Sequence, residues 1–140
     1  MKIVFLDAAT MGDVSFEPFE QLGEFVSYPT STPTEARERV KDADVVMINK
    51  VIVNKELIDA APSLKLICVA ATGVNNIDVD YAASKGIPVR NVAGYSTDSV
   101  AQSTFMHILS LAGGAPYFDN SVKSGSYSRS GMFTDPNWNW

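Results

Sequence analysis

Short apolar runs recur along the first two-thirds of the chain at a nearly constant spacing. Their starts lie about 20 residues apart, which is the length of one strand, one helix and two short loops. The runs cover Ile3–Leu6, Phe25–Tyr28, Val45–Ile48, Leu64–Val69 and Ile87–Val92. They are continuous rather than alternating, as strands are when helices cover both faces of a sheet. The pattern therefore predicts a parallel sheet.

Helix signals lie between these runs. The segment Thr32–Glu35 has the sequence of a capping box with proline at the first helical position. Asn54 and Asp78 can each cap a further helix, and Gly86 is the left-handed residue expected just past the helix that begins after Asp78. A helix around residues 17–22 is only weakly signalled. The strand–helix alternation predicts an α/β, flavodoxin-like three-layer domain with a five-stranded parallel sheet.

After Gly94 the pattern changes to a long helix, predicted over residues 99–112. Its apolar positions form a wide stripe at helical spacing: Val100, Ala101, Phe105, Ile108, Leu109 and Ala112. A second, weaker helix is predicted over residues 116–123. From Ser124 onward the sequence shows no period, which predicts a loop.

Composition narrows the class of protein. The chain is 46% hydrophobic with a net charge of −5, which is typical of a soluble globular protein and argues against a nucleic-acid partner. No stretch approaches the roughly 20 apolar residues of a membrane span, and the opening run is too short for a signal peptide. Cys68, the single cysteine, lies in an apolar run and is predicted to be buried and inert. These features predict a cytoplasmic location.

Candidate chemistry follows from the fold, because ligands of an open parallel sheet bind beyond the carboxyl ends of its strands. Thr72-Gly73, after the fourth run, could expose consecutive amide N–H groups to a carboxylate or phosphate. The alternative, which the residues alone favour, is a plain connecting turn formed with Asn75 and Asn76. Lys50, after the third run, could neutralise an anionic substrate or simply be solvated.

Several functions are disfavoured. A phosphoreceiver domain needs an acidic pair after its first strand, whereas Asp7 stands alone and the third run ends in Asn49-Lys50. The segment 7–12 is a poor flavin-phosphate loop. His107, the only histidine, has no carboxylate one turn away and is interpreted as a surface residue. The sequence contains no metal-ligand cluster and no G-x-G-x-x-G motif.

The stretch from residue 72 to 104 resembles the D-isomer-specific 2-hydroxyacid dehydrogenases in order, spacing and glycines. The matching motifs are Thr72–Asp78, Lys85–Val89, Asn91-Val92, Tyr95–Thr97 and Val100-Ala101. Asn49-Lys50 and Asp7-Ala8 look most like the glycerate dehydrogenase (hydroxypyruvate reductase) branch. Gln102 departs from the family's usual glutamate.

The resemblance implies a division of the chain and a set of site residues. Residues 1–96 would be the substrate domain, and residues 97–140 would begin a Rossmann domain that binds NAD. The amides of Thr72 and Gly73 would hold the substrate carboxylate, with Tyr95, Asn49 and Lys50 nearby, and Thr72 and Thr104 would contact NAD. A hydroxyl on the apolar stripe needs a partner, which suits Thr104.

The implied activity is NAD-dependent interconversion of a small D-2-hydroxy acid and its 2-keto acid, with glycerate and hydroxypyruvate favoured. The family's catalytic arginine, glutamate and histidine and its glycine-rich coenzyme loop come from later sequence. The 140 residues are therefore expected to be an inactive truncation, with no catalytic residue and no metal site. A homodimer through the 97–112 helix is also expected. A non-catalytic interaction module, like the family's co-repressor branch, is the alternative.

Overall fold

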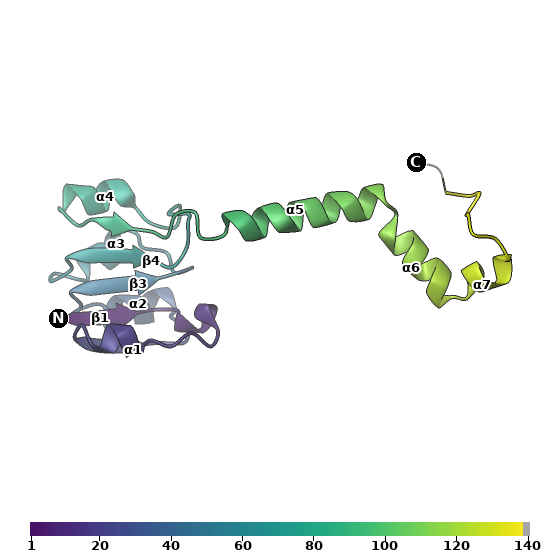
Figure 1. Ribbon diagram of the computed structural model, residues 1–140. Helices are drawn as coiled ribbons and strands as arrows, with labels where there is room; N and C mark the ends of the chain where they lie inside the picture. Colours follow the sequence, from purple (N-terminus) through teal and green to yellow (C-terminus); the bar gives the residue numbers. More distant parts are fainter. Residues whose placement is uncertain (139–140) are drawn as a thin grey trace. The chain divides into compact units, whose positions relative to one another are not determined.

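The computed structural model describes residues 1–138. The chain forms two compact units, Met1–Gly94 and Tyr95–Trp140 (Figure 1). The first contains a sheet and short helices, whereas the second is entirely helical apart from its last residues. Among the described residues, no helix is both long enough and apolar enough to cross a membrane.

The first unit is built on a five-stranded sheet in which every neighbouring pair is parallel. The strands are β1 (Lys2–Phe5), β2 (Glu24–Ser27), β3 (Val45–Ile48), β4 (Leu66–Val69) and β5 (Val89–Arg90). Their order is β2-β1-β3-β4-β5. Each apolar run of the sequence overlaps one strand, so the predicted α/β fold with a five-stranded parallel sheet is confirmed.

The helices of this unit include three that begin where their capping residues predict and two without a capping side chain. They are the 3-10 helix η1 (Ala8–Met11) and the α-helices α1 (Glu17–Glu20), α2 (Pro33–Arg39), α3 (Lys55–Asp59) and α4 (Val79–Ser84). Before α2, the amide of Glu35 donates to the Thr32 hydroxyl and the amide of Thr32 donates to the Glu35 carboxylate, at 3.3 and 2.8 Å. The Asn54 and Asp78 side chains cap α3 and α4 by accepting the amide hydrogens of Leu57 and Tyr81, at 3.1 and 3.0 Å.

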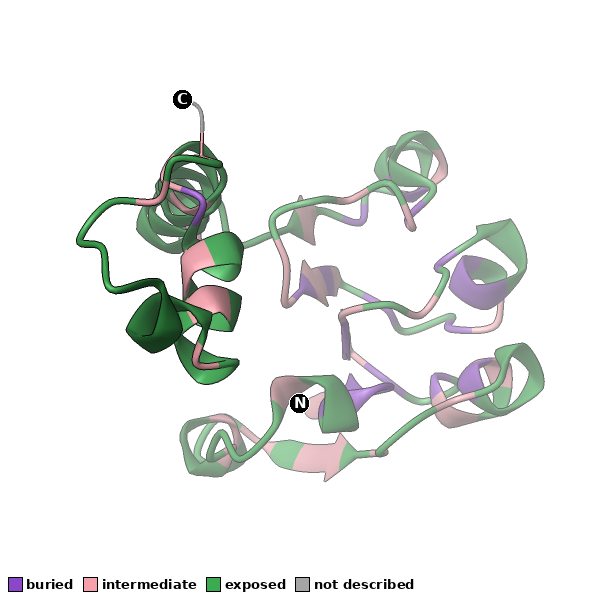
Figure 2. Cartoon of the chain, turned by 90° about the vertical axis from the view of Figure 1, so that its right-hand side faces the viewer, coloured by how far each residue is buried: buried purple, intermediate pink, exposed green. Residues whose placement is uncertain are grey.

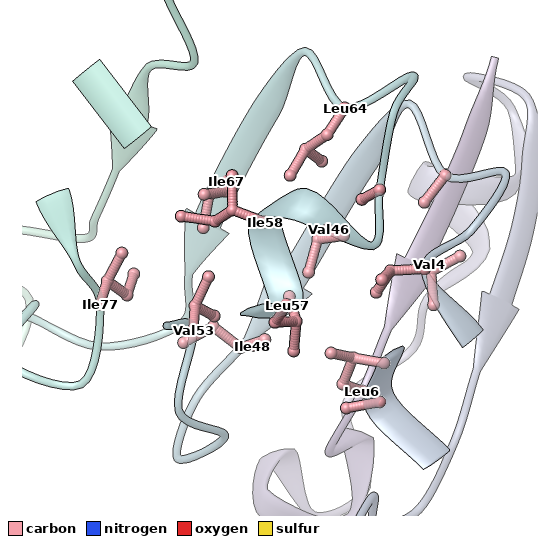
Figure 3. Packing of buried hydrophobic residues seen from close by; sticks show 14 of the residues in the cluster. Val4, Leu6, Val46, Ile48, Val53, Leu57, Ile58, Leu64, Ile67 and Ile77 are labelled. Carbon is pink, nitrogen blue, oxygen red and sulfur yellow. The ribbon is translucent and has the colours of Figure 1, made fainter. Parts of the chain in front are cut away.

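The two faces of the sheet bury different side chains. Val4 and Leu6 point to a core formed with α2, α3 and α4, which Figure 3 shows from close by. The intervening residues, Ile3 and Phe5, point to a second core, where Phe5 meets the ring of Phe16 edge-on at 5.6 Å. Because both faces are buried, the strands carry continuous apolar runs.

Cover over the second face is incomplete, and the prediction of a buried Cys68 is wrong for that reason. Only η1, α1 and strand-end residues contribute to this face, and α1 packs beside β2 at the sheet edge. The β4 side chains that point to it, Leu66 and Cys68, stay half-buried. Figure 2 colours the chain by how far each residue is buried. Burial still raises the pKa of the Cys68 thiol, while the nearby Arg90 opposes the shift.

The second unit contains three helices, α5 (Thr97–Ala112), α6 (Ala115–Lys123) and α7 (Ser126–Ser130). The first two confirm the predicted helices. The predicted loop after Ser124 is wrong over α7, which lies between the left-handed residues Gly125 and Gly131. A helix of five residues is too short to show a helical period in its sequence.

Candidate functional site at the carboxyl edge of the sheet

Three candidate segments come together because β1, β3 and β4 are neighbours in the sheet. Parallel strands end at the same edge, so the residues that follow them share it. Asp7 follows β1, Asn49 and Lys50 follow β3, and Thr72 and Gly73 follow β4. All of them belong to the first unit.

Asp7 organises the loop after β3, a role that the sequence analysis missed. Its carboxylate is only 5% exposed and accepts the amide hydrogens of Asn49, Lys50 and Val51 at 2.8, 2.6 and 3.0 Å. A buried carboxylate needs such donors, because an unpaired charge away from water is costly. An ionisable residue directly after an apolar strand is the signal that could have pointed to it.

Asn76 holds the same loop by donating hydrogen bonds to two of the loop's carbonyl groups. Its side-chain nitrogen donates to the carbonyls of Asn49 and Val51 at 3.3 and 2.8 Å. In the backbone, the amide of Val53 donates to the Asn76 carbonyl at 2.8 Å. Asn76 is therefore more than the turn former considered from the sequence, since it cross-links the loops after β3 and β4.

Thr72 and Gly73 present the amide groups that the sequence analysis singled out. Both residues are exposed, and no acceptor in residues 1–138 takes either amide hydrogen. The Thr72 hydroxyl donates to the carbonyl of Val92 at 3.0 Å, and the Asn91 side chain donates to the Thr72 carbonyl at 2.6 Å. The loop is thus braced from the segment after β5, while its two amide hydrogens have no acceptor among the described residues. This arrangement can receive a carboxylate.

Lys50 lies exposed beside a second cationic side chain. It borders a hollow of about 290 Å³ together with Arg37, and the walls include Pro33, Val51 and Leu57. Within the described part of the chain, neither Lys50 nor Arg37 forms an ion pair with a carboxylate. Two uncompensated cations attract an anion to this part of the edge.

The other predicted site residues, Tyr95 and Thr104, belong to the second unit. That they lie close to the four predicted site residues of the first unit stays a prediction. Those four are Asn49, Lys50, Thr72 and Gly73. The side chain of Tyr95 is open to solvent, with 67% of the residue exposed. The Thr104 hydroxyl donates to the carbonyl of Val100 at 2.8 Å, one turn earlier in α5. The hydroxyl thus finds a partner within its own helix, and its oxygen can still accept a hydrogen bond. His107 is exposed, as predicted for a surface residue.

A separate polar cluster links α3 to α4. Asp59 accepts from Lys55 at 2.7 Å and from the Tyr81 hydroxyl at 2.6 Å, and Lys85 lies 3.2 Å away. The hydrogen bond from Lys55, followed by those from Tyr81 and Lys85, holds the pKa of Asp59 well below its usual range. In turn, the hydrogen bond to Asp59, followed by the one to Tyr81, raises the pKa of Lys55. Because one carboxylate joins two lysines and a tyrosine from α3 and α4, we give this cluster a structural role.

Comparison with known proteins places this geometry in a family. The family described as "D-isomer specific 2-hydroxyacid dehydrogenase, catalytic domain" matches residues 3–134. A hydroxypyruvate reductase of Blautia hydrogenotrophica is 34% identical over 143 aligned residues, covering 99% of this chain and 43% of the relative. A glycerate dehydrogenase of Methylorubrum extorquens is 34% identical over 133 residues, covering 94% and 42%.

A solved structure agrees with these relatives. The D-lactate dehydrogenase of Aquifex aeolicus, complexed with NAD and lactic acid, superimposes with a TM-score of 0.70 at 29% identity, covering 87% of this chain and 37% of that one. The chain thus spans less than half the length of the relatives it matches. Family match, sequence relatives and fold agree, and the chain belongs to the D-isomer-specific 2-hydroxyacid dehydrogenases.

Proposed function

We propose that the first unit is the substrate-binding part of an NAD-dependent oxidoreductase that interconverts a small D-2-hydroxy acid and its 2-keto acid. Glycerate and hydroxypyruvate are the favoured pair, in keeping with the names of the relatives from Blautia and Methylorubrum. The observation that carries the proposal is the pair of exposed residues Thr72 and Gly73, whose amides have no acceptor in residues 1–138.

In this proposal the substrate carboxylate accepts hydrogen bonds from the two amides, as an anion does in a backbone nest. Lys50 supplies positive charge along the same edge, and Asn49 beside it supplies a polar side chain. Tyr95 of the second unit would complete the surroundings of the substrate. A small acid suits these groups because they bind charge and hydrogen-bonding atoms rather than a large apolar body.

The cofactor in this proposal is NAD, which when bound exchanges a hydride with the substrate carbon. Thr72 and Thr104 would contact it. Both hydroxyl hydrogens are already donated, to Val92 and Val100, so each oxygen can only accept from the cofactor. The fit is therefore to donor groups of the cofactor, such as a carboxamide NH₂. Tight NAD binding and turnover are not expected of the 140 residues alone, because no catalytic histidine or arginine is assigned among them.

An NMR titration of the ¹⁵N-labelled 140-residue chain tests the substrate site. Hydroxypyruvate at millimolar concentration is expected to shift the amide resonances of Thr72, Gly73 and Lys50. A Gly73→Val chain is the control, since a side chain there would meet the Asn75 side-chain oxygen at 3.0 Å and crowd the nest. Absence of shifts in the native chain, or equal shifts in the Val variant, would contradict the proposal. Heat-sensitive oxidation of NADH by the chain would contradict the expected lack of turnover.

A second copy of the chain is the proposed protein partner, through the helix at residues 97–112. Large apolar side chains of α5 are open to water, with Phe105 63% and Leu109 68% exposed. Burying each one is worth roughly 1.5–3 kcal/mol, and two-fold pairing lets one patch cover itself.

We place the protein in the cytoplasm, where the single unpaired thiol, Cys68, would stay reduced.

Sedimentation at micromolar concentration tests this pairing. The native chain is expected to sediment as a dimer or larger, and a Phe105→Glu, Leu109→Glu chain as a monomer. A native monomer in which the α5 amides are protected from hydrogen exchange would instead indicate that the helix is covered within its own chain.

A further inference from the structure

Every backbone amide of the three-residue loop after β3, Asn49–Val51, donates a hydrogen bond within the protein. The amides of Asn49, Lys50 and Val51 all donate to the buried Asp7 carboxylate, and the carbonyls of Asn49 and Val51 both accept from the Asn76 side chain. Asp7 and Asn76 come from two different segments, one after β1 and one after β4. The loop is therefore fixed on both of its hydrogen-bonding sides.

This arrangement decides what the loop can offer a ligand. With its three amides taken, the loop cannot bind an anion through its backbone, in contrast to Thr72 and Gly73. Its means of contact are the side chains, and the charged one is Lys50, which is exposed at the hollow that it shares with Arg37. The backbone bonds fix where the Lys50 side chain starts, so they fix the region that its ammonium group can reach.

The negative charge of Asp7 would oppose an anionic substrate if it were open to the edge. It is 5% exposed, and three amide dipoles point at it. These dipoles offset the charge locally. The positive charge of Lys50 is thus presented outward while the carboxylate that positions it stays shielded.

We propose that Asp7 and Asn76 are positioning residues for substrate binding, which act through the loop Asn49–Val51 and the ammonium group of Lys50. The inference rests on the proposed function, since it takes the small 2-keto acid as the ligand that Lys50 meets. It adds to the proposed site two residues that do not themselves contact the substrate.

A matched carboxylate separates this role from a general contribution to stability. Asp44, at the opposite edge of the sheet, accepts the amide of Lys2 at 2.8 Å and the ammonium group of Lys65 at 2.7 Å. Like Asp7, it joins segments far apart in the sequence, but it contacts no candidate substrate residue. Asp44→Asn is therefore the control for Asp7→Asn. Asn76→Ser removes the two donated hydrogen bonds without altering the buried charge, and it decides the case if Asp7→Asn does not fold.

The experiment titrates hydroxypyruvate into the ¹⁵N-labelled chains and measures, on the same samples, amide hydrogen exchange at residues 49–51 and unfolding by urea. Asp7→Asn is expected to speed exchange at all three amides and to weaken binding about tenfold, and Asn76→Ser to weaken it about threefold. Asp44→Asn should lower the stability while leaving the Kd within about twofold of the native value.

Native affinity and native exchange in folded Asp7→Asn or Asn76→Ser chains would overturn the inference, as would equal weakening by Asp44→Asn. If the native chain itself shows no binding of hydroxypyruvate, the proposed substrate fails. Exchange at the three amides then still decides whether Asp7 and Asn76 hold the loop.

Discussion

The hydroxyl of Thr72 donates to the carbonyl of Val92 across 3.0 Å and fastens the loop after β4 to the segment after β5. The Asn91 side chain returns a bond to the Thr72 carbonyl at 2.6 Å. The two bonds run in opposite directions between the same two segments. They set the orientation of the peptide groups that carry the open amides of Thr72 and Gly73.

Loss of the Thr72 hydroxyl should loosen this connection. Thr72→Val is expected to lower the free energy of unfolding by about 1 kcal/mol, because a hydrogen bond between two segments is lost. Thr104→Val is the control, since its hydroxyl bonds only to its own helix and its loss should cost less than about 0.5 kcal/mol. Urea unfolding at pH 7 measures both, and equal losses would contradict the expectation.

The cluster around Asp59 should make stability depend on acid pH. Its pKa is lowered chiefly by Lys55, so the folded state favours the ionised form more than the unfolded chain does. The resulting stabilisation is complete well above the unfolded pKa of about 4 and is lost as the pH falls through the lower folded value. Native and Asp59→Asn chains should therefore differ most near pH 7 and converge in strong acid. A difference that stays constant down to pH 2 would contradict this expectation.

Gly114 adopts a left-handed conformation, with φ of 59°, and a side chain there would overlap the Trp138 ring. Gly131 has a similar φ of 66° with open space around it. In a Trp140→Phe background, Gly114→Ala should shift Trp138 fluorescence to the red, because the indole must move. Gly131→Ala should bear the same conformational cost, about 1 kcal/mol, without the shift. A red shift in both chains, or in neither, would show that the ring does not rest on Gly114.

The thiol of Cys68 should react slowly. Burial raises its pKa and Arg90 partly offsets the shift, so the thiolate is scarce near neutral pH. Iodoacetamide at pH 7.5 is expected to alkylate the folded chain at least about tenfold more slowly than the urea-unfolded chain. Arg90→Gln should slow the folded reaction further. An unchanged or faster rate in that variant would argue against the influence of Arg90.

Much of the fold could be predicted because it depends on local signals. The apolar runs mark the strands, and the Thr32 capping box marks the start of α2. Helix α7 could not be predicted, because five residues between two glycines carry no period. The half-burial of Cys68 depends on how few elements cover one sheet face, which no window around residue 68 records.

The candidate site likewise contains residues that the sequence locates and residues that it does not. The general rule on strand ends locates Thr72, Gly73 and Lys50 from the sequence. The roles of Asp7 and Asn76 could not be inferred from the sequence. The hydrogen bonds that Asp7 accepts come from amides 42–44 residues later in the chain, and they exist only when β1 lies beside β3. No spacing in the sequence shows this adjacency.

The same strand order sets a sequence of events during synthesis and folding. Asp7 leaves the ribosome more than forty residues before the amides whose hydrogens its carboxylate accepts. Until β3 docks against β1, this carboxylate remains hydrated and the loop has no fixed form. Closing a long segment of chain is entropically costly and slow compared with forming a helix. The loop after β3 is thus among the last parts of the first unit to become ordered, and its order indicates that the central strands have assembled.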